Sequence, residues 1–214
     1  MVLSWYNGGV MLPWKKILKG FKWVGITLGA LFAILVIVRI PHVLEVQKTA
    51  EQVAVIHATK LTLADVMGEN LPPDPGAEAD KTIAGIDANT NGIRDDVELA
   101  IFKEYPDSAR VRAVLLQYAL ALQMEVNQPM INKDTVTEVV REQSRAYSCV
   151  GSVVSREDLN NYLMEGGKLR SFVIEKQRNT LDRIKARKDF VEKIGSYSES
   201  ENNVCDIDLV SLLN

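Results

Sequence analysis

The chain has 214 residues with 25 basic and 28 acidic side chains, so its formal net charge is −3. This length accommodates a membrane anchor and one domain of about 150 residues with a sizeable core. Residues 1–40 contain five Lys and Arg and no acid, whereas residues 41–214 contain 20 basic and 28 acidic residues, a net charge of −8. An acidic second part argues against nucleic acid as a partner, because phosphate-backbone binding needs clustered Lys and Arg.

The first predicted element is a membrane span. Sixteen uncharged residues, 23–38, lie between Lys22 and Arg39. As a helix they extend ~24 Å, slightly less than the ~30 Å hydrocarbon core, and the long side chains of Lys22 and Arg39 can reach the headgroups. We therefore expect residues 1–22 to be a basic cytoplasmic segment and residues 23–40 to be a transmembrane signal anchor in contact with membrane lipid.

The charges around the span predict its orientation. Four lysines precede it and only Arg39 follows closely, which places the N-terminus in the cytoplasm by the positive-inside rule. The expected topology is a single pass with the C-terminal domain on the far side of the membrane. A cleaved signal peptide is the main alternative, but residues 39–46 contain no small-x-small cleavage site. A buried core helix is a third interpretation, which the flanking lysines oppose.

After the span, residues 41–68 predict a membrane-proximal helix, because apolar side chains from Val43 to Val53 recur at helical spacing. Pro41 should mark the boundary, since proline ends or kinks a helix. Residues 69–86 are rich in Pro, Gly and acidic residues, a composition that disfavours regular structure. We expect this connector to be a flexible joint.

The next twelve residues, 87–98, carry the strongest chemical signal in the chain. Oxygen-bearing side chains fall at loop positions 1, 3, 5, 9 and 12, a backbone carbonyl is available at position 7, and Gly92 stands at position 6, where the backbone must turn sharply. The side chains are those of Asp87, Asn89, Asn91, Asp95 and Glu98, and the carbonyl is that of Ile93. A Ca²⁺ ion takes six to eight oxygen ligands, so this spacing predicts one calcium ion as the cofactor. The alternative is an Asx-rich turn that caps a helix.

The spacing of these residues resembles the calcium loops of the EF-hand superfamily over about twelve of the 214 residues. The half from Gly92 to Glu98 is more similar to the variant loops of thrombospondin-type-3-like repeats and of related exported bacterial proteins. An ordinary EF-hand has an apolar residue at position 8, where this chain has Arg94. The resemblance implies one bound Ca²⁺ in a protein anchored in the bacterial inner membrane, with its C-terminal domain in the periplasm or outside the cell, and it supplies no activity. Positions 3 and 5 are Asn rather than Asp, so the loop has fewer carboxylate ligands. We therefore expect weak calcium binding, with a Kd of about 10⁻⁵ to 10⁻³ M.

Residues 99–195 predict a helical domain. Residues 109–126 are apolar on most faces, which is typical of a helix at the centre of a bundle. Helix starts are expected at Asp107 or Ser108, at Asp134 or Thr135, at Ser155 in a capping-box-like sequence, and at Asn179 or Thr180. Gly166 and Gly167 should weaken or bend one helix, and the charged residues from Arg178 to Glu192 should form a solvated face, with a basic recognition surface as the alternative.

No strand alternation of any length follows residue 80. The predicted fold class is therefore mostly α: an N-terminal transmembrane helix followed by a small helical bundle with one calcium-loop insertion. The chain has two cysteines, Cys149 and Cys205. In an oxidising compartment they are expected to pair and to tie the C-terminal tail, residues 196–214, to the bundle, with two free thiols as the alternative.

Catalysis would need a convergent set of acid, base or nucleophile. The chain has no nucleophile elbow, phosphate-binding glycine loop, His-Glu-x-x-His or Cys-x-x-Cys motif. We therefore expect an exported, membrane-anchored domain with calcium as a structural brace, acting as a binding module for a protein partner in the cell envelope and not as an enzyme. The alternatives are a calcium-responsive regulator, an enzyme of unrecognised type, or a scaffold without metal.

Overall fold

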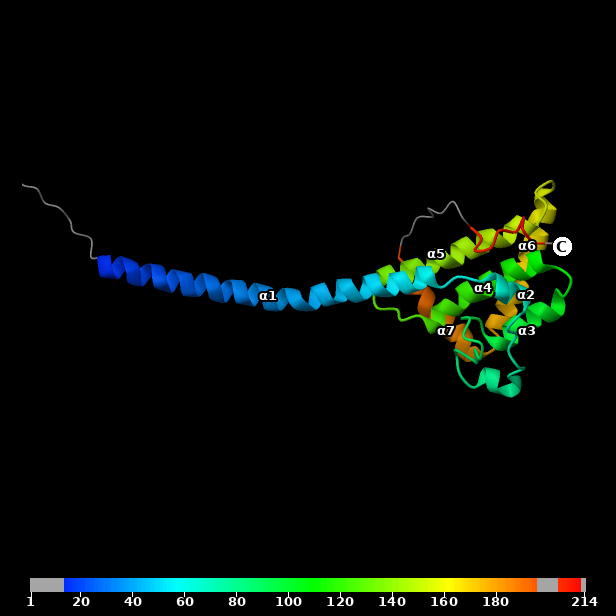
Figure 1. Cartoon of the computed structure of the whole chain (residues 1–214), viewed down its shortest axis with the longest axis horizontal. Helices are drawn as coiled ribbons and strands as arrows, with labels where there is room; N and C mark the ends of the chain where they lie inside the picture. Colours follow the sequence, from blue (N-terminus) through cyan, green and yellow to red (C-terminus); the bar gives the residue numbers. More distant parts are fainter. Residues whose placement is uncertain (1–13, 196–203, 213–214) are drawn as a thin grey trace, which may run out of the picture. The chain divides into compact units, whose positions relative to one another are not determined.

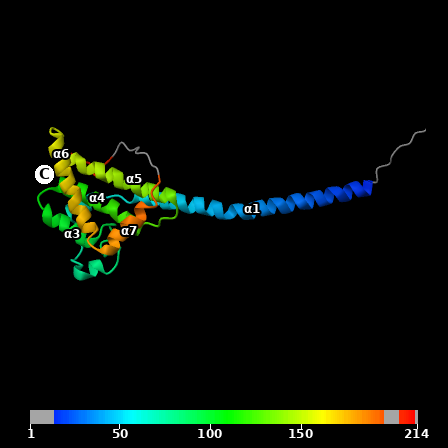
Figure 2. The same ribbon diagram turned by 180° about the vertical axis from the view of Figure 1, so that it is seen from behind.

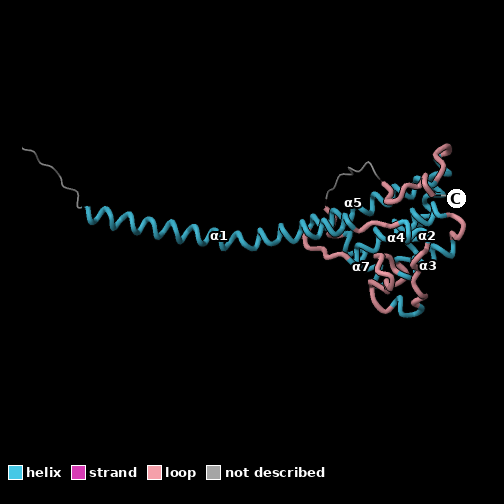
Figure 3. Tube along the Cα trace, in the orientation of Figure 1, coloured by secondary structure: helices cyan, strands magenta, loops and turns pink. Residues whose placement is uncertain are grey.

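The computed structural model describes residues 14–195 and 204–212, and these residues form helices and loops without any β-strand (Figures 1 and 3). The helices are α1 (Trp14–Ala58), α2 (Leu63–Met67), α3 (Asp95–Glu104), α4 (Ala109–Asn127), α5 (Lys133–Val150), α6 (Leu159–Gln177) and α7 (Leu181–Val191), with 3-10 turns η1 (Gly76–Asp80) and η2 (Gly151–Val153). The mostly α prediction is confirmed. The chain divides into two compact units, residues 1–47 and 48–214.

The described part of the first unit consists of α1 up to Gln47. It contains the one helix in the described residues that is long and apolar enough to cross a membrane, and none of its most apolar stretch is buried. This exposure contradicts the buried-core interpretation. The helix also continues through Pro41 to Ala58, so the boundary predicted at Pro41 is wrong. The proline removes one hydrogen bond, to the Ile37 carbonyl, and the helical residues on both sides tolerate that loss.

In the second unit, α4 is the central helix, as predicted. It packs against α2, α3, α5, α6 and α7, and it lies beside α5 in both ribbon views (Figures 1 and 2). Fourteen residues of α4 are buried, namely Ala109 and every residue from Arg112 to Met124. A helix that is apolar on most faces needs neighbours on most sides, and this helix has them.

The helix starts agree with the sequence at two of four positions. Ser108 caps α4 by accepting the Val111 N–H, and Thr180 caps α7 by accepting the Arg183 N–H. For α5 the prediction is wrong, because Asn132 is the cap and Thr135 completes its capping box from inside the helix. For α6 the cap is Asp158. The Ser155 hydroxyl instead accepts the Glu157 N–H in a local turn.

Neither Gly166 nor Gly167 interrupts α6. The charged segment from Arg178 to Glu192 also differs from the prediction. Arg183 is only 3 % exposed and donates to the connector, at the carbonyls of Ala79 (2.5 Å), Thr82 (3.1 Å) and Ile83 (3.0 Å). The connector, which contains η1, is therefore more regular than its composition suggested, because a buried guanidinium group satisfies its carbonyls.

Cys149 and Cys205 form a disulfide with their Cα atoms 5.1 Å apart, as predicted. The chain around Cys205 is also bound to the bundle by polar contacts. The Gln117 amide donates to the Val204 carbonyl at 2.8 Å and accepts the Asp206 N–H at 2.9 Å, and the Asp206 carboxylate pairs with Arg145 at 2.8 Å. The described part of the tail, residues 204–212, is thus docked on α4 and α5, whereas residues 196–203 of the predicted tail lie outside the described residues, as do residues 1–13 of the N-terminal segment.

Candidate metal centre

The 87–98 loop follows the connector, and its last four residues form the first turn of α3. Ile93 and Val97 are fully buried in the core of the second unit. The side chain of Ile93, at position 7 of the loop, therefore faces the core. The two apolar side chains fix the loop against the bundle.

The first half of the loop is a tight turn built on Asp87. The Asp87 carboxylate accepts the N–H groups of Asn91 at 3.1 Å and Gly92 at 2.9 Å, and the Asn91 side-chain oxygen accepts the Ile93 N–H at 2.9 Å. Thr90 and Gly92 have positive φ values of 57° and 85°. These bonds are typical both of a calcium loop and of an Asx-rich turn, so they do not separate the two interpretations.

Gly92 is required at its position for two reasons. Its φ is in the left-handed region, and a Cβ added there would lie 2.7 Å from the Leu120 side chain of α4. We predict that Gly92→Ala lowers the free energy of unfolding by about 1–3 kcal/mol in urea denaturation. Gly167→Ala is the matched control, because its Cβ would meet nothing within 4 Å inside α6 and should stabilise by about 0.5–1 kcal/mol. If Gly92→Ala left the free energy of unfolding unchanged, glycine would not be required at this position.

Glu98 carries a buried carboxyl, because the residue is only 1 % exposed. Its two oxygens accept the side-chain N–H groups of Asn91 and Asn89, each at 3.1 Å. Burial raises the pKa of Glu98 to about 7, the two amides oppose the shift, and the charges of Asp65 and Asp95 add to it. The groups that act on this buried carboxyl thus include two further acids and no Lys or Arg.

Asn89 contains an unsatisfied atom beside Glu98. Its side-chain nitrogen donates to the Asn70 carbonyl at 3.0 Å and to Glu98, but its Oδ1 is buried and has no hydrogen-bond partner. Buried polar atoms without hydrogen-bond partners are rare in native proteins, so this oxygen is a candidate ligand for an ion or a water. An amide oxygen is also one of the ligand types that Ca²⁺ accepts.

The structure does not bring all six predicted ligands together. The side chains of Asn89, Asn91 and Glu98 meet, but the Asp95 carboxylate accepts the Ala88 N–H at 3.0 Å, and both Asp87 oxygens accept backbone N–H groups. The described residues contain no group of three or more His, Cys, Asp or Glu side chains placed to hold a metal ion. A cation in this loop would therefore depend on amide and carbonyl oxygens as well as on Glu98.

Asp65 is a residue of this region that sequence reasoning missed. It lies in α2, where it completes the capping box of Thr62, and its charge raises the pKa of Glu98. Asp65 and three of the predicted ligands also line a cavity of about 560 Å³ beside the loop. Its lining residues are Ala58, Thr59, Lys60, Thr62, Asp65, Asp87, Asn89, Thr90, Asn91, Gly92, Asn127 and Gln128. The loop is therefore accessible to a cation from one side.

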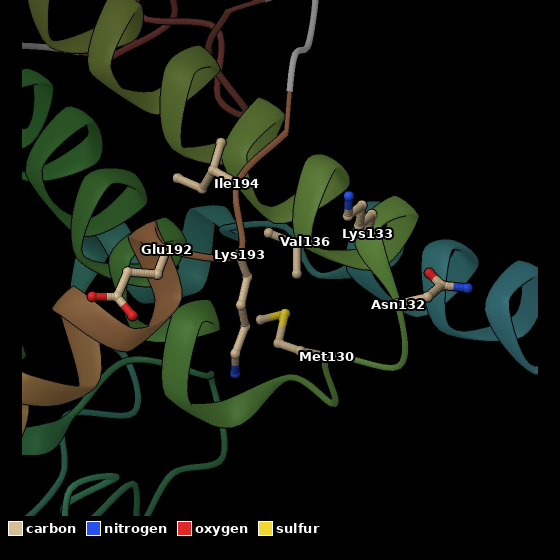
Figure 4. Close-up of a pocket in the computed structure, with 7 residues that line it drawn as sticks. All are labelled: Met130, Asn132, Lys133, Val136, Glu192, Lys193 and Ile194. Atoms are coloured by element: carbon tan, nitrogen blue, oxygen red, sulfur yellow. The ribbon is translucent and has the colours of Figure 1, made fainter.

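A smaller cavity of about 310 Å³ lies where the loop between α4 and α5 meets the end of α7 (Figure 4). It contains none of the predicted site residues. Its two lysines, Lys133 and Lys193, point away from each other in Figure 4, and Asn132 is used to cap α5 and to bind the Thr49 hydroxyl at 2.7 Å. We therefore interpret this cavity as a gap in the packing of α5 and α7 and not as a ligand-binding site.

No protein-family model, curated protein or solved structure matches the chain.

Proposed function

We propose that this protein is a membrane-anchored helical domain that binds one calcium ion in the 87–98 loop as a structural brace. The observation that carries the proposal is the pairing of Glu98, a buried carboxyl without a cation beside it, with the unsatisfied Oδ1 of Asn89. A divalent cation supplies both missing interactions, because it offsets the buried charge and takes a neutral oxygen as a ligand.

The residues that would hold the ion are those of the predicted loop. Glu98, Asn89, Asn91 and Asp87 would contribute side-chain oxygens and Ile93 its carbonyl, with Asp95 remaining on the Ala88 N–H. The Asn89 and Asn91 amides now direct N–H groups at Glu98. Turning each amide about its last bond exchanges nitrogen for oxygen and needs little space, because the two ends have nearly the same shape. The turn gives up the bond of Asn89 to the Asn70 carbonyl and that of Asn91 to the Ile93 N–H, which contacts with the ion would have to replace.

A structural role fits this loop better than a sensor role. A sensor exposes an apolar groove when calcium binds, and such an opening would have to uncover Ile93, Val97 and Ile101, which are fully buried in the core of the second unit. Calcium that binds only the folded chain stabilises it by mass action. The calcium-responsive regulator is the alternative function.

The anchor and its orientation are the second part of the proposal. Exposure of the apolar part of α1 supports a membrane span, and the lysines before it support a cytoplasmic N-terminus with the second unit exported to the periplasm or beyond. The disulfide is compatible with an oxidising compartment. A protein partner in the envelope and the absence of catalysis stay predictions of the sequence.

The test is thermal melting of the full-length protein in a non-ionic detergent, followed by circular dichroism, in EGTA, in about 2 mM Ca²⁺ and in Mg²⁺. We expect a Ca²⁺-specific rise in Tm of about 4 °C when calcium is ten times above its Kd. Glu98→Gln should abolish the rise. Glu104→Gln is the matched control, because Glu104 is an exposed carboxylate in the same helix, and it should retain the full response.

The behaviour of Glu98→Gln in EGTA separates a metal site from a structural hydrogen-bond acceptor. Because the metal-free chain buries a carboxyl without a cation, replacing it by the neutral amide should leave the Tm in EGTA unchanged or raise it. A variant that melts lower in EGTA by as much as in Ca²⁺, together with a native protein that does not respond to calcium, would refute the metal site and leave an Asx-rich turn.

A further inference from the structure

The cavity beside the 87–98 loop is larger than a metal ion needs. Its volume is about 560 Å³, which lies in the range of ~300–1,000 Å³ that small-molecule sites occupy. A Ca²⁺ ion lies only about 2.3–2.6 Å from its oxygen ligands. An ion held by the loop would therefore leave most of this cavity open to a second ligand.

The lining of the cavity is polar. Among the described residues that form it, only Ala58 and Gly92 lack a polar side chain, and the other ten are Thr, Lys, Asp, Asn or Gln. Sites for apolar ligands are lined mainly by hydrophobic and aromatic side chains. This cavity therefore fits a ligand that is itself polar over most of its surface.

Three side chains bring unused hydrogen-bonding groups to the lining. The side-chain oxygen of Asn127 accepts from Gln123 at 3.2 Å, and that of Gln128 accepts from Gln52 at 2.7 Å. Their side-chain nitrogens have no partner within the part of the chain that the structure describes, and neither does the Thr90 hydroxyl. The amides donate, and the hydroxyl both donates and accepts, so these groups match the oxygens of an uncharged ligand.

The charges of the region disfavour an anionic ligand. Four carboxylates belong to the loop and to the lining, those of Asp65, Asp87, Asp95 and Glu98. A bound Ca²⁺ offsets two of these charges and leaves two uncompensated. Lys60, the one basic residue among the described residues of the lining, is paired with Glu142, whose two oxygens lie 2.9 and 3.0 Å from its Nζ. A carboxylate or phosphate ligand would therefore be repelled.

The loop also leaves coordination positions open toward the cavity. Asp87, Asn89 and Asn91 line the cavity, whereas the buried Glu98 does not. The ligands of the proposed site supply at most about six oxygens, and Ca²⁺ accepts up to about eight. Two hydroxyl groups on adjacent carbons of one ligand can fill two neighbouring positions, because they lie close together and are uncharged.

From these observations we infer that the cavity binds a neutral polyhydroxylated ligand of the sugar class, whose adjacent hydroxyl groups complete the coordination of the calcium ion. Asn127, Gln128 and Thr90 hydrogen-bond the hydroxyls that do not touch the ion. The inference rests on the proposed calcium site and names what that site binds. Because the linkage between two ligands is reciprocal, the sugar must also tighten the binding of calcium.

The experiment measures this linkage in the full-length protein. The detergent has a polyoxyethylene headgroup, because a sugar headgroup would itself be a ligand. The apparent Kd of Ca²⁺ is determined by equilibrium dialysis, alone and with glucose, galactose, mannose or N-acetylglucosamine. We expect at least one of these neutral sugars to lower the Kd about fivefold or more. The Kd is measured in place of the Tm because sugars stabilise folded proteins without binding them.

Glucuronate and galacturonate test the charge argument. Each has the ring of its neutral counterpart, glucose or galactose, and carries a carboxylate in addition. At constant ionic strength and with free calcium held equal, each should lower the Kd less than its neutral counterpart does. A charged sugar that lowers the Kd as much or more would overturn the assignment of a neutral ligand.

Asn127→Ala tests the cavity as the place of binding. Asn127 is exposed, and Gln123 keeps its bond to the Ala84 carbonyl at 2.7 Å without it. The variant should bind calcium like the native protein and lose most of the sugar-dependent change in Kd. The matched control is Asn161→Ala, an exposed asparagine of α6 outside the lining, which should retain both. A full sugar effect in Asn127→Ala would overturn the cavity as the site.

Dextran, a soluble glucose polymer, separates a free sugar from a glycan chain. A lower Kd with dextran would assign a glycan chain, and a lower Kd with monosaccharides alone would assign a free sugar. Calcium binding that neither the four neutral sugars nor dextran changes would overturn this inference and leave the calcium site intact. A native protein that binds no calcium would refute both.

Discussion

Reducing the disulfide between Cys149 and Cys205 is expected to lower the free energy of unfolding by about 4 kcal/mol and the Tm by about 10 °C. The bond joins residues that are 56 positions apart, and a cross-link over such a length removes much of the conformational freedom of the unfolded chain. The measurement is thermal melting of the full-length protein in detergent, with and without a thiol reductant.

The reduced protein should nevertheless keep its helical signal below the transition. Residues 204–206 remain bound to α4 and α5 through Gln117 and Arg145, and the Leu61 N–H donates to the Asp206 carboxylate at 3.0 Å. Cys205→Ser should melt like the reduced native protein, and reductant should have no further effect on it. An unchanged Tm after complete reduction would mean that these polar contacts alone hold the segment.

The parts of the fold that were predictable are those specified by local patterns. The membrane-spanning part of α1 follows from a run of apolar residues between two basic ones, and α4 follows from an apolar helix that needs neighbours on most sides. In the loop, the spacing of Asn89, Asn91 and Glu98 correctly placed these three side chains together, because a twelve-residue turn determines its own geometry.

The parts that were not predictable depend on contacts between distant segments. Charges from Arg178 to Glu192 look like a solvated face because their spacing contains no information about the connector that packs on α7. Arg183 is buried only because residues 79–83 lie against it. Asp65 acts on Glu98 for the same kind of reason. The carboxylates of Asp87 and Asp95 accept backbone N–H groups, a choice that ligand spacing cannot foresee.

Replacing Arg94 is the second change with a large expected effect. Arg94 stands at position 8 of the loop, where an ordinary EF-hand is apolar, and it is fully buried. It pairs with Asp96 at 2.5 Å and donates to the Lys176 carbonyl at 2.6 Å and the Gln177 carbonyl at 3.3 Å. These carbonyls end α6, where a helix has unsatisfied acceptors and a partial negative charge.

Arg94→Ala should therefore lower the free energy of unfolding by about 3–5 kcal/mol, because it leaves a carboxylate and the end of a helix without their shared donor. Urea denaturation of the full-length protein in EGTA measures this effect without a contribution from calcium. Arg156→Ala removes an exposed arginine and should change stability by less than about 0.5 kcal/mol.

Comparing the stability loss of Asp96→Asn with that of Arg94→Ala shows which contacts of Arg94 stabilise the fold. Asp96 is partly exposed, so Asp96→Asn should cost less than Arg94→Ala, about 1 kcal/mol. Equal effects would mean that the ion pair dominates and that the carbonyls of α6 contribute little. A smaller loss for Asp96→Asn would instead show that Arg94 acts mainly by joining the first turn of α3 to the last turn of α6, which fixes the loop whether or not a metal ion is bound.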